Sequence, residues 1–182
     1  MEIAAPVRLI FVLRGAACCS GLYLDVSGQR MRRGAGLVAW PKTRGYNQIW
    51  RHDPISGTIQ SRLNGLVVDI EGGAVEAIGA RVITWTATGR RNQQFDLAPC
   101  SGHTATEEDL LAEASGLGGG SMRLTARGSG LAVGVELDGE TGGVEPGARV
   151  LTLPIEGDLS GKPRLLRWRV VPLRAKSTDV LA

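Results

Sequence analysis

Two sets of residues recur along the chain at nearly constant spacing, and their types suit the binding of a sugar. The first set is Asp25, Gly28, Trp40, Asn47 and Gln48, and the second, 44 or 45 residues later, is Asp69, Gly72, Trp85, Asn92 and Gln93. A sugar presents neighbouring hydroxyls on one edge and C–H groups on one face. A site for it needs a charged acceptor, an amide and a flat ring, and both sets contain all three. The sequence therefore predicts two carbohydrate sites.

Each residue type has a distinct expected role. An ionised aspartate accepts strong hydrogen bonds from two hydroxyls, and an asparagine amide both donates and accepts at the same hydroxyls. The tryptophan ring offers a rigid apolar face on which a sugar can stack. The glycine three residues after each aspartate lets the backbone approach a ligand closely. The glutamine beside each asparagine is expected to hold the aspartate from behind.

A purely structural role for these residues is the alternative, because aspartates also stabilise turns and tryptophans also pack in sheets. A third, degenerate copy of the pattern helps to choose. In it, Gly134 replaces the aspartate, Leu153 replaces the tryptophan and Leu165-Leu166 replaces Asn-Gln. Acceptor, ring and amides are lost together, so they behave as one unit. This favours binding in the first two copies and a scaffold role for the third.

The elements that must position these residues are short strands separated by turns rich in glycine. Apolar runs of strand length are Val7–Leu13, Leu22–Val26, Leu37–Trp40, Leu66–Ile70, Val82–Trp85, Leu131–Val135, Val150–Ile155 and Leu165–Val170. Pairs such as Ser27-Gly28 and Asn64-Gly65 predict the tight connections between them. Three copies of about four strands each predict a closed, antiparallel all-β assembly without open sheet edges.

One domain of three repeats accounts for the whole chain of 182 residues. Its segments are expected to be the repeats at approximately 5–62, 63–100 and 122–173, an insertion at 101–121 and a tail at 174–182. Within the insertion, Thr104 and Glu107 are spaced as a helix-capping box, so it is expected to be a short helix or a loop. The insertion is either a lid or a tolerated surface excursion. The second is favoured because lengthening a loop costs little free energy.

Both copies resemble repeats of the ricin B-type lectins, a β-trefoil family with Gln-x-Trp motifs. The residues that carry the resemblance are Gly21-Leu-Tyr-Leu-Asp25-Val-Ser-Gly28, Trp40 and Asn47-Gln48-Ile49-Trp50, then Gly65-Leu-Val-Val-Asp69-Ile-Glu-Gly72, Trp85 and Asn92-Gln93-Gln94-Phe95. The resemblance implies a β-trefoil of three ~45-residue repeats. It also implies non-catalytic binding of galactose or N-acetylgalactosamine-type glycans. Trp50, Phe95 and Trp168 are then expected in the core.

The chain departs from that family pattern in two ways that bear on specificity. Val38 and Ile83 stand two residues before the stacking tryptophans, where many members carry a polar residue, so one hydrogen bond to the ligand is expected to be missing. Three arginines, Arg30, Arg32 and Arg33, also follow the first aspartate. They either favour an acidic sugar at the first site or belong to a solvated loop, and the loop is the preferred interpretation.

Composition and motifs argue against several other classes. With 21 Lys and Arg against 18 Asp and Glu, the net charge of +3 does not resemble a nucleic-acid-binding surface. No uncharged run approaches the ~20 residues of a membrane-spanning helix. Cys18, Cys19, Cys100 and His103 lack the spacing of a zinc site, and neither His103 nor His52 belongs to a catalytic motif. We therefore expect no enzyme, no metal and no cofactor.

Glycans or glycoconjugates are the expected partners, without nucleic acid or membrane insertion, and homodimerisation is left open. The alternative function is a protein-interaction module or protease inhibitor that acts through loops or residues 101–121. The N-terminus does not fit a signal peptide, because Glu2 has the wrong charge and Arg8 and Arg14 bracket too short an apolar run. A cytoplasmic location is therefore expected, with unconventional release as an alternative.

Overall fold

The computed structural model describes residues 7–11, 21–99, 122–136, 143–155, 164–165 and 168–172. Its strands are β1 (Val7–Phe11), β2 (Leu22–Val26), β3 (Ala35–Pro41), β4 (Trp50–Asp53), β5 (Thr58–Ser61), β6 (Val67–Ile70), β7 (Val82–Trp85), β8 (Phe95–Pro99), β9 (Met122–Ala126), β10 (Leu131–Glu136), β11 (Leu151–Pro154), β12 (Arg164–Leu165) and β13 (Trp168–Pro172). Short 3-10 helices are η1 (Ser27–Gln29), η2 (Tyr46–Gln48), η3 (Glu71–Gly73) and η4 (Arg91–Gln93). The predicted 101–121 insertion, the 174–182 tail and the three cysteines with His103 lie outside the described residues.

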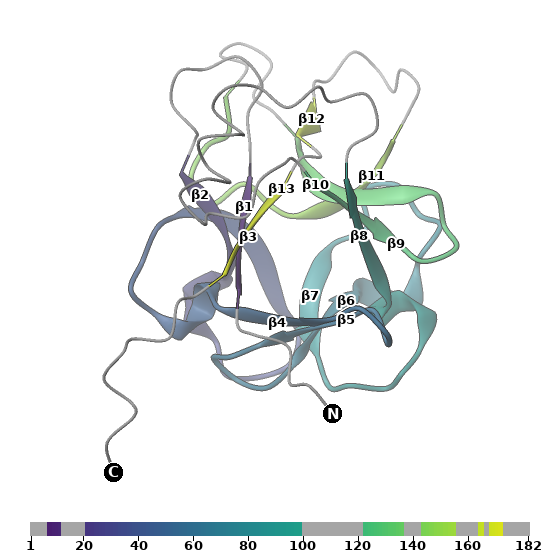
Figure 1. The fold of residues 1–182 in the computed structure, drawn as a ribbon, viewed down its shortest axis with the longest axis horizontal. Helices are drawn as coiled ribbons and strands as arrows, with labels where there is room; N and C mark the ends of the chain where they lie inside the picture. Colours follow the sequence, from purple (N-terminus) through teal and green to yellow (C-terminus); the bar gives the residue numbers. More distant parts are fainter. Residues whose placement is uncertain are drawn as a thin grey trace.

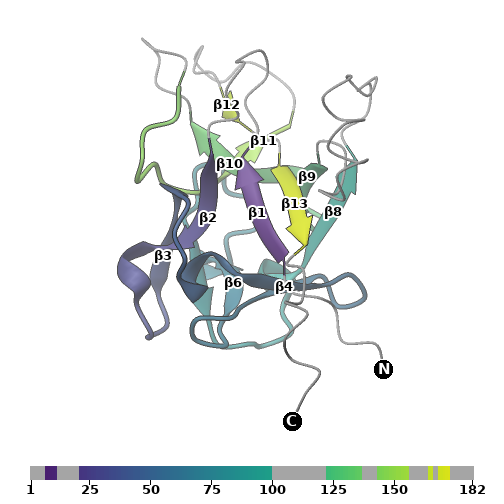
Figure 2. The ribbon, with the colours of Figure 1, turned by 60° about the vertical axis from the view of Figure 1, so that its left-hand side comes forward.

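Six strands close into a ring (Figures 1 and 2). Strand β1 pairs with both β4 and β13, β4 pairs with β5, β8 pairs with β9, and β9 pairs with β13, all antiparallel. The gap between β5 and β8 is joined at the turn before β5, where the Phe95 amide donates to the Gly57 carbonyl at 2.8 Å. Ring closure leaves these strands without open edges, which is how small antiparallel proteins avoid edge-to-edge association.

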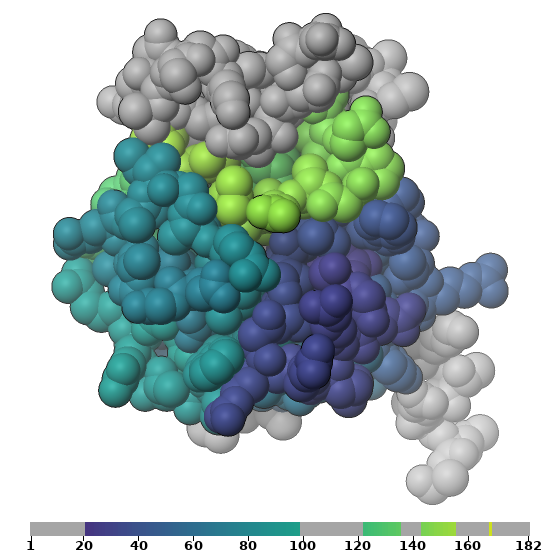
Figure 3. Space-filling view, turned by 180° about the vertical axis from the view of Figure 1, so that it is seen from behind, coloured from purple at the N-terminus to yellow at the C-terminus, as the bar shows by residue number. Residues whose placement is uncertain are grey.

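Three hairpins, β2–β3, β6–β7 and β10–β11, cover one end of this ring and meet around a pseudo-threefold axis. Bridges join them in a cycle, since Gly36 pairs with Ile83, Arg81 with Leu151 and Val38 with Arg149. Figure 3 shows the face on which segments of the three repeats, coloured purple to blue, teal and yellow-green, come together. The all-β trefoil architecture predicted from the repeat is confirmed.

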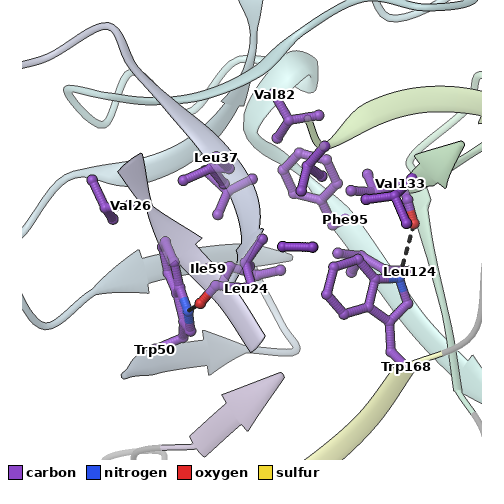
Figure 4. Packing of buried hydrophobic residues seen from close by; sticks show 14 of the residues in the cluster. Leu24, Val26, Leu37, Trp50, Ile59, Val82, Phe95, Leu124, Val133 and Trp168 are labelled. Carbon is purple, nitrogen blue, oxygen red and sulfur yellow. Dashed lines mark hydrogen bonds between the residues drawn. The ribbon is translucent and has the colours of Figure 1, made fainter. Parts of the chain in front are cut away.

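The core is organised by one aromatic residue from each repeat. Trp50, Phe95 and Trp168 are fully buried, as predicted (Figure 4). The Trp50 indole N–H donates to the Leu24 carbonyl at 3.0 Å, and the Trp168 indole N–H donates to the Val133 carbonyl at 2.8 Å. These equivalent bonds place Val133 at the position of Leu24. The third repeat therefore keeps the backbone register of the first although it lacks the polar residues.

The strand predictions hold for most elements, but the last apolar run behaves differently. The run Leu165–Val170 was expected to form one strand. The structure instead has two short strands there, because β12 pairs with β10 whereas β13 pairs with β1 and β9. A run of apolar residues predicts burial well, but it does not say which neighbour each part will pair with. In the described part of the chain, no helix has the length and apolarity needed to cross a membrane.

Candidate functional site

The first predicted set of residues, apart from Gln48, lines a cavity of about 560 Å³, which we call site 1. It is lined by Asp25, Ser27, Gly28, Gln29, Val38, Trp40, Thr43, Asn47 and Gly147. The antiparallel register of the β2–β3 hairpin brings these side chains to one face. Asp25 lies opposite Val38, and Tyr23 lies opposite Trp40, so the acceptor and the ring share one face of the hairpin, and the core residues Leu24 and Ala39 lie on the other face.

Asp25 is held by two amide donors that come from η2. Asn47 Nδ2 donates to Asp25 Oδ2 at 2.6 Å, and Gln48 Nε2 donates to the same oxygen at 2.8 Å. Asp25 is only 3% exposed, so burial of its carboxyl group would be costly without such partners. The arrangement fixes the carboxylate before any ligand arrives.

Gln48 lies behind this carboxylate and does not line the cavity. Its side-chain oxygen accepts from the Thr43 amide at 2.7 Å, and its Nε2 also donates to the Pro41 carbonyl at 2.8 Å. In the second repeat Gln93 does the same: it donates to Asp69 Oδ2 at 2.6 Å and to the Thr86 carbonyl at 2.9 Å. The prediction that the glutamines hold the aspartates is confirmed, and direct ligand contact by either glutamine is not expected.

The second predicted set, apart from Gln93, lines a larger cavity of about 870 Å³, which we call site 2. It is lined by Asp69, Glu71, Gly72, Gly73, Val75, Ile83, Trp85, Thr88, Gly89, Arg90, Arg91 and Asn92. The β6–β7 register repeats that of site 1, with Asp69 opposite Ile83 and Val67 opposite Trp85. Thus Val38 and Ile83, the apolar departures noted in the sequence, form a wall of each cavity.

The two sites differ in the placement of their asparagine. Asn47 is buried against Asp25, whereas Asn92 is half-buried and donates to the Ile70 carbonyl at 3.4 Å. The cause is the residue two positions earlier. A Cβ on Gly45 would overlap Asn47 Oδ1, and the second repeat has Arg90 at that position. The sequence analysis missed this difference, although the alignment of Gly45 with Arg90 at the repeat spacing is a signal for it.

Each stacking tryptophan is also contacted by the preceding repeat around the axis. A Cβ on Gly147 would lie 3.4 Å from Trp40 Cζ3, and one on Gly34 would lie 3.6 Å from Trp85 Cζ3. Both glycines have positive φ, and their amides donate to Ala39 and Thr84 carbonyls at 2.8 and 2.7 Å. Site 1 therefore takes a lining residue, Gly147, from the third repeat, which a reading of one repeat at a time could not find, whereas all lining residues of site 2 belong to the second repeat.

The arginines that follow Asp25 are exposed, and one of them, Arg33, lies beside the tryptophan of site 2. Arg33 Cζ lies 5.2 Å from the centre of the Trp85 ring, a cation–π distance. Arg33 does not line the site 2 cavity, so its guanidinium contacts the ring from outside that cavity. Trp40 has no such partner among the described residues and is 43% exposed. The exposure of all three arginines agrees with the preferred interpretation of a solvated loop, and Arg33 in addition reaches the neighbouring repeat.

Gly28 and Gly72 line site 1 and site 2, but the structure shows a requirement for glycine other than the predicted close approach of the backbone to a ligand. Both have positive φ, 63° and 69°, inside η1 and η3. Side chains rarely adopt this conformation, whereas glycine does so readily. No atom lies within 4 Å of a Cβ built on Gly72. The observed requirement is the turn that follows each aspartate, and that turn shapes the rim of each cavity.

The pKa values of both site aspartates are raised above the ordinary 3.8. Burial is the main cause at Asp25 and Asp69, and it outweighs the amide donors Asn47 and Gln48 or Gln93 and Asn92, which lower the pKa. At Asp69 the nearby charge of Glu71 raises the pKa further. A sugar hydroxyl donates to the ionised carboxylate, so protonation of these groups should weaken sugar binding.

We expect Asp25 and Asp69 to titrate above 3.8 in an NMR titration of the side-chain carboxyl carbons. Asp53 is an internal control, because the Ser56 hydroxyl and the Ile55 amide lower the pKa of this exposed group. Sugar affinity should fall as the pH is lowered through the pKa values of Asp25 and Asp69. Midpoints below that of Asp53 would contradict the assignment of burial as the dominant cause.

The third repeat presents neither acceptor nor ring at the equivalent positions. Gly134 has no side chain, and Leu153 is buried, with 2% of its surface exposed. Within the described ranges, no group of three or more His, Cys, Asp or Glu side chains is arranged to hold a metal ion.

Comparisons with known proteins agree with this architecture. Residues 16–85 match the family model described as ricin-type beta-trefoil lectin domain-like. The designed threefold symmetric protein ThreeFoil is 26% identical, with a TM-score of 0.67 over 92% of this chain and 99% of that one. None of the curated proteins matches the chain.

Two natural lectins share the fold at lower identity. The ricin B-like lectin of Macrolepiota procera, solved with lactose, is 15% identical, with a TM-score of 0.64 over 95% of this chain and 99% of that one. The C-half of the earthworm R-type lectin, solved with GalNAc, is also 15% identical, with a TM-score of 0.57 over 93% of this chain and 99% of that one. The chain thus has the β-trefoil fold, and over residues 16–85 its resemblance to the ricin-type β-trefoil lectins is confirmed.

Proposed function

We propose that the protein is a lectin that reversibly binds galactose or N-acetylgalactosamine-type glycans through sites 1 and 2. The observation that carries this proposal is that each cavity unites a prearranged carboxylate, an asparagine and a tryptophan. The family match supports carbohydrate binding in general. The lactose in the Macrolepiota procera lectin structure and the GalNAc in the earthworm lectin structure support the galactose-type preference.

Binding at each site follows from the fixed geometry. The aspartate accepts from two adjacent sugar hydroxyls while the tryptophan ring covers the apolar face of the sugar. Because the amides already orient the carboxylate, little ordering is needed when the ligand binds. No bond is made or broken in this scheme, so we propose a binding protein and not an enzyme.

Each site is expected to bind a single sugar weakly, because it is open to solvent and has few polar contacts. Two sites on one domain increase the strength of attachment to a surface that presents many sugars. Site 1 has a buried asparagine and an exposed ring, whereas site 2 has a more accessible asparagine and a ring contacted by Arg33. We therefore expect the two sites to differ in affinity for the same glycan.

A glycan array tests the proposal with the wild-type chain and the Trp40→Ala/Trp85→Ala variant. We expect signal on galactose-terminated glycans from the wild type and none from the variant, since both stacking faces are removed. Ile55→Ala is the matched control, because it removes another large apolar side chain that is 90% exposed. Circular dichroism establishes that all three proteins are folded.

Two outcomes of this array would contradict the proposal. One is the absence of any glycan signal from a folded wild-type protein at high concentration. The other is signal that persists in the double variant, because binding would then depend on a different surface. A function through residues 101–121 would leave partner binding unchanged in the double variant, and a pull-down with that segment deleted would detect it.

A further inference from the structure

A third cavity, of about 360 Å³, lies where the three hairpins meet, and we call it the axial cavity. It is lined by Ser27, Arg30, Gly36, Leu37, Val38, Arg81, Val82, Arg149 and Val150. Its only charged lining residues are three arginines, one from each repeat. The cavity lies on the face shown in Figure 3, where the purple to blue, teal and yellow-green segments meet.

The pseudo-symmetry explains how this cavity arises. Gly36, Arg81 and Arg149 precede the equivalent core positions Leu37, Val82 and Val150, and backbone bonds between repeats tie these positions together: the Val82 amide donates to Val150 and the Val150 amide to Leu37. Two of the three equivalent positions are thus arginines, and the third has no side chain. A Cβ on Gly36 would lie only 3.2 Å from Arg81 Nη2, so glycine leaves room for this guanidinium.

The positive charge of the cavity is only partly neutralised. Arg81 Nη1 donates to both carboxylate oxygens of Glu71, at 3.2 and 3.1 Å. Neither Arg30 nor Arg149 forms an ion pair with any described carboxylate. The guanidinium groups of Arg30 and Arg149 and the Nη2 group of Arg81 therefore border one small cavity without an ion pair to a described carboxylate. Like charges that border one small cavity repel each other, and a bound anion would relieve that repulsion.

The cavity also adjoins site 1. Ser27 and Val38 line both cavities, so they form a shared wall between the arginines and the sugar site. Asp25 lies opposite Val38 in the β2–β3 ladder. A sugar held by Asp25 and Trp40 would therefore lie next to the cavity that the guanidinium groups border.

We propose that Arg30, Arg81 and Arg149 bind a tetrahedral oxyanion, sulfate or phosphate, in the axial cavity. Guanidinium groups pair with such oxyanions through paired N–H donors. Three of them around one cavity match an anion with several outward oxygens better than a planar carboxylate with two. An extension of this inference rests on the proposed lectin function. A sugar that carries a sulfate or phosphate group would fill site 1 with its ring and the axial cavity with its anionic group.

The anion site can be tested without any sugar. Sodium sulfate and sodium phosphate are titrated separately into the protein at constant ionic strength, and the amide signal of Gly36 is followed by NMR. We expect saturable shifts, weakened about tenfold in Arg149→Gln and in Arg30→Gln, because each change removes one charged donor. Arg51→Gln is the matched control, since it removes an exposed arginine from β4, outside the cavity. Shifts that do not saturate, or that are equal in all variants, would overturn the site.

The link to site 1 is tested with galactose, galactose-6-sulfate and galactose-6-phosphate. We expect one of the charged sugars to bind about tenfold more tightly than galactose, and Arg149→Gln to remove this gain while galactose affinity stays unchanged. Equal affinity for all three sugars would overturn the joint site. If no sugar binds at all, the lectin proposal fails, and the titrations with inorganic anions still decide whether the axial cavity binds an oxyanion.

Discussion

Asp69→Ala is expected to remove one of two sugar sites and to leave the other intact. The chain has four tryptophans, and their indole N–H signals report each region separately by NMR. On titration of the wild type with galactose, the signals of Trp40 and Trp85 should shift. Those of Trp50 and Trp168 should not, because these indoles are buried and donate to backbone carbonyls. In Asp69→Ala only Trp40 should respond, and in Asp25→Ala only Trp85.

The size of this effect depends on how the sugar is presented. Loss of one site should reduce attachment to a galactose-coated surface by roughly 10²-fold or more, because the second, intramolecular binding event is lost. The fold should persist, since Gln93 keeps its bonds to the Thr86 carbonyl and the Thr88 amide. Surface plasmon resonance measures this loss for each variant.

Glu76→Ala is the control for these aspartate variants, because it removes an exposed carboxylate that lines neither cavity. Its binding should match that of the wild type. The assignment of two independent sites would be wrong if Asp69→Ala abolished the response of both Trp40 and Trp85 in a folded protein. It would also be wrong if both signals still shifted.

Gly57→Ala is expected to produce the largest loss of stability among the glycine substitutions. Gly57 has a φ of 74°, and a Cβ there would lie 2.9 Å from both the amide nitrogen and the carbonyl oxygen of Phe95. It would also lie 2.8 Å from Arg127 Cζ, whose guanidinium donates to the Pro54 and Ile55 carbonyls. The methyl group would displace the bond that joins the turn before β5 to β8.

The expected cost combines two effects that a second glycine separates. The left-handed backbone costs about 1–2 kcal/mol for an alanine, and disruption of a buried hydrogen bond costs about 1–3 kcal/mol. Gly65 has a φ of 71° but no atom within 4 Å of a built Cβ, so Gly65→Ala should show the first effect alone. Urea unfolding followed by tryptophan fluorescence gives both values. Equal losses in the two variants would show that the close contact at Gly57 carries no energetic weight.

The sequence alone predicted the repeat, most of the strands and the Asp, Gly, Trp and Asn residues that line sites 1 and 2, while sugar binding at these cavities stays a prediction. Asp25 and Asp69 share a spacing with their tryptophans because each repeat makes the same hairpin, and hairpin register is local. The core role of Trp50, Phe95 and Trp168 was also predictable, since recurring large apolar residues at repeat spacing must fill equivalent places. These inferences depend on contacts within one repeat.

Only the tertiary structure decided how the repeats meet. Arg33 follows Asp25 in the chain but lies against Trp85, and Gly147 of the third repeat borders Trp40. Arg30, Arg81 and Arg149 are far apart in sequence but border one cavity. A periodic pattern specifies which residues are equivalent, but the contacts between equivalent units arise when the ring closes around its axis. That closure is a long-range event, so the wall that site 1 shares with the axial cavity, and the positions of Arg81 and Arg149 beside it, could not be found from spacing alone.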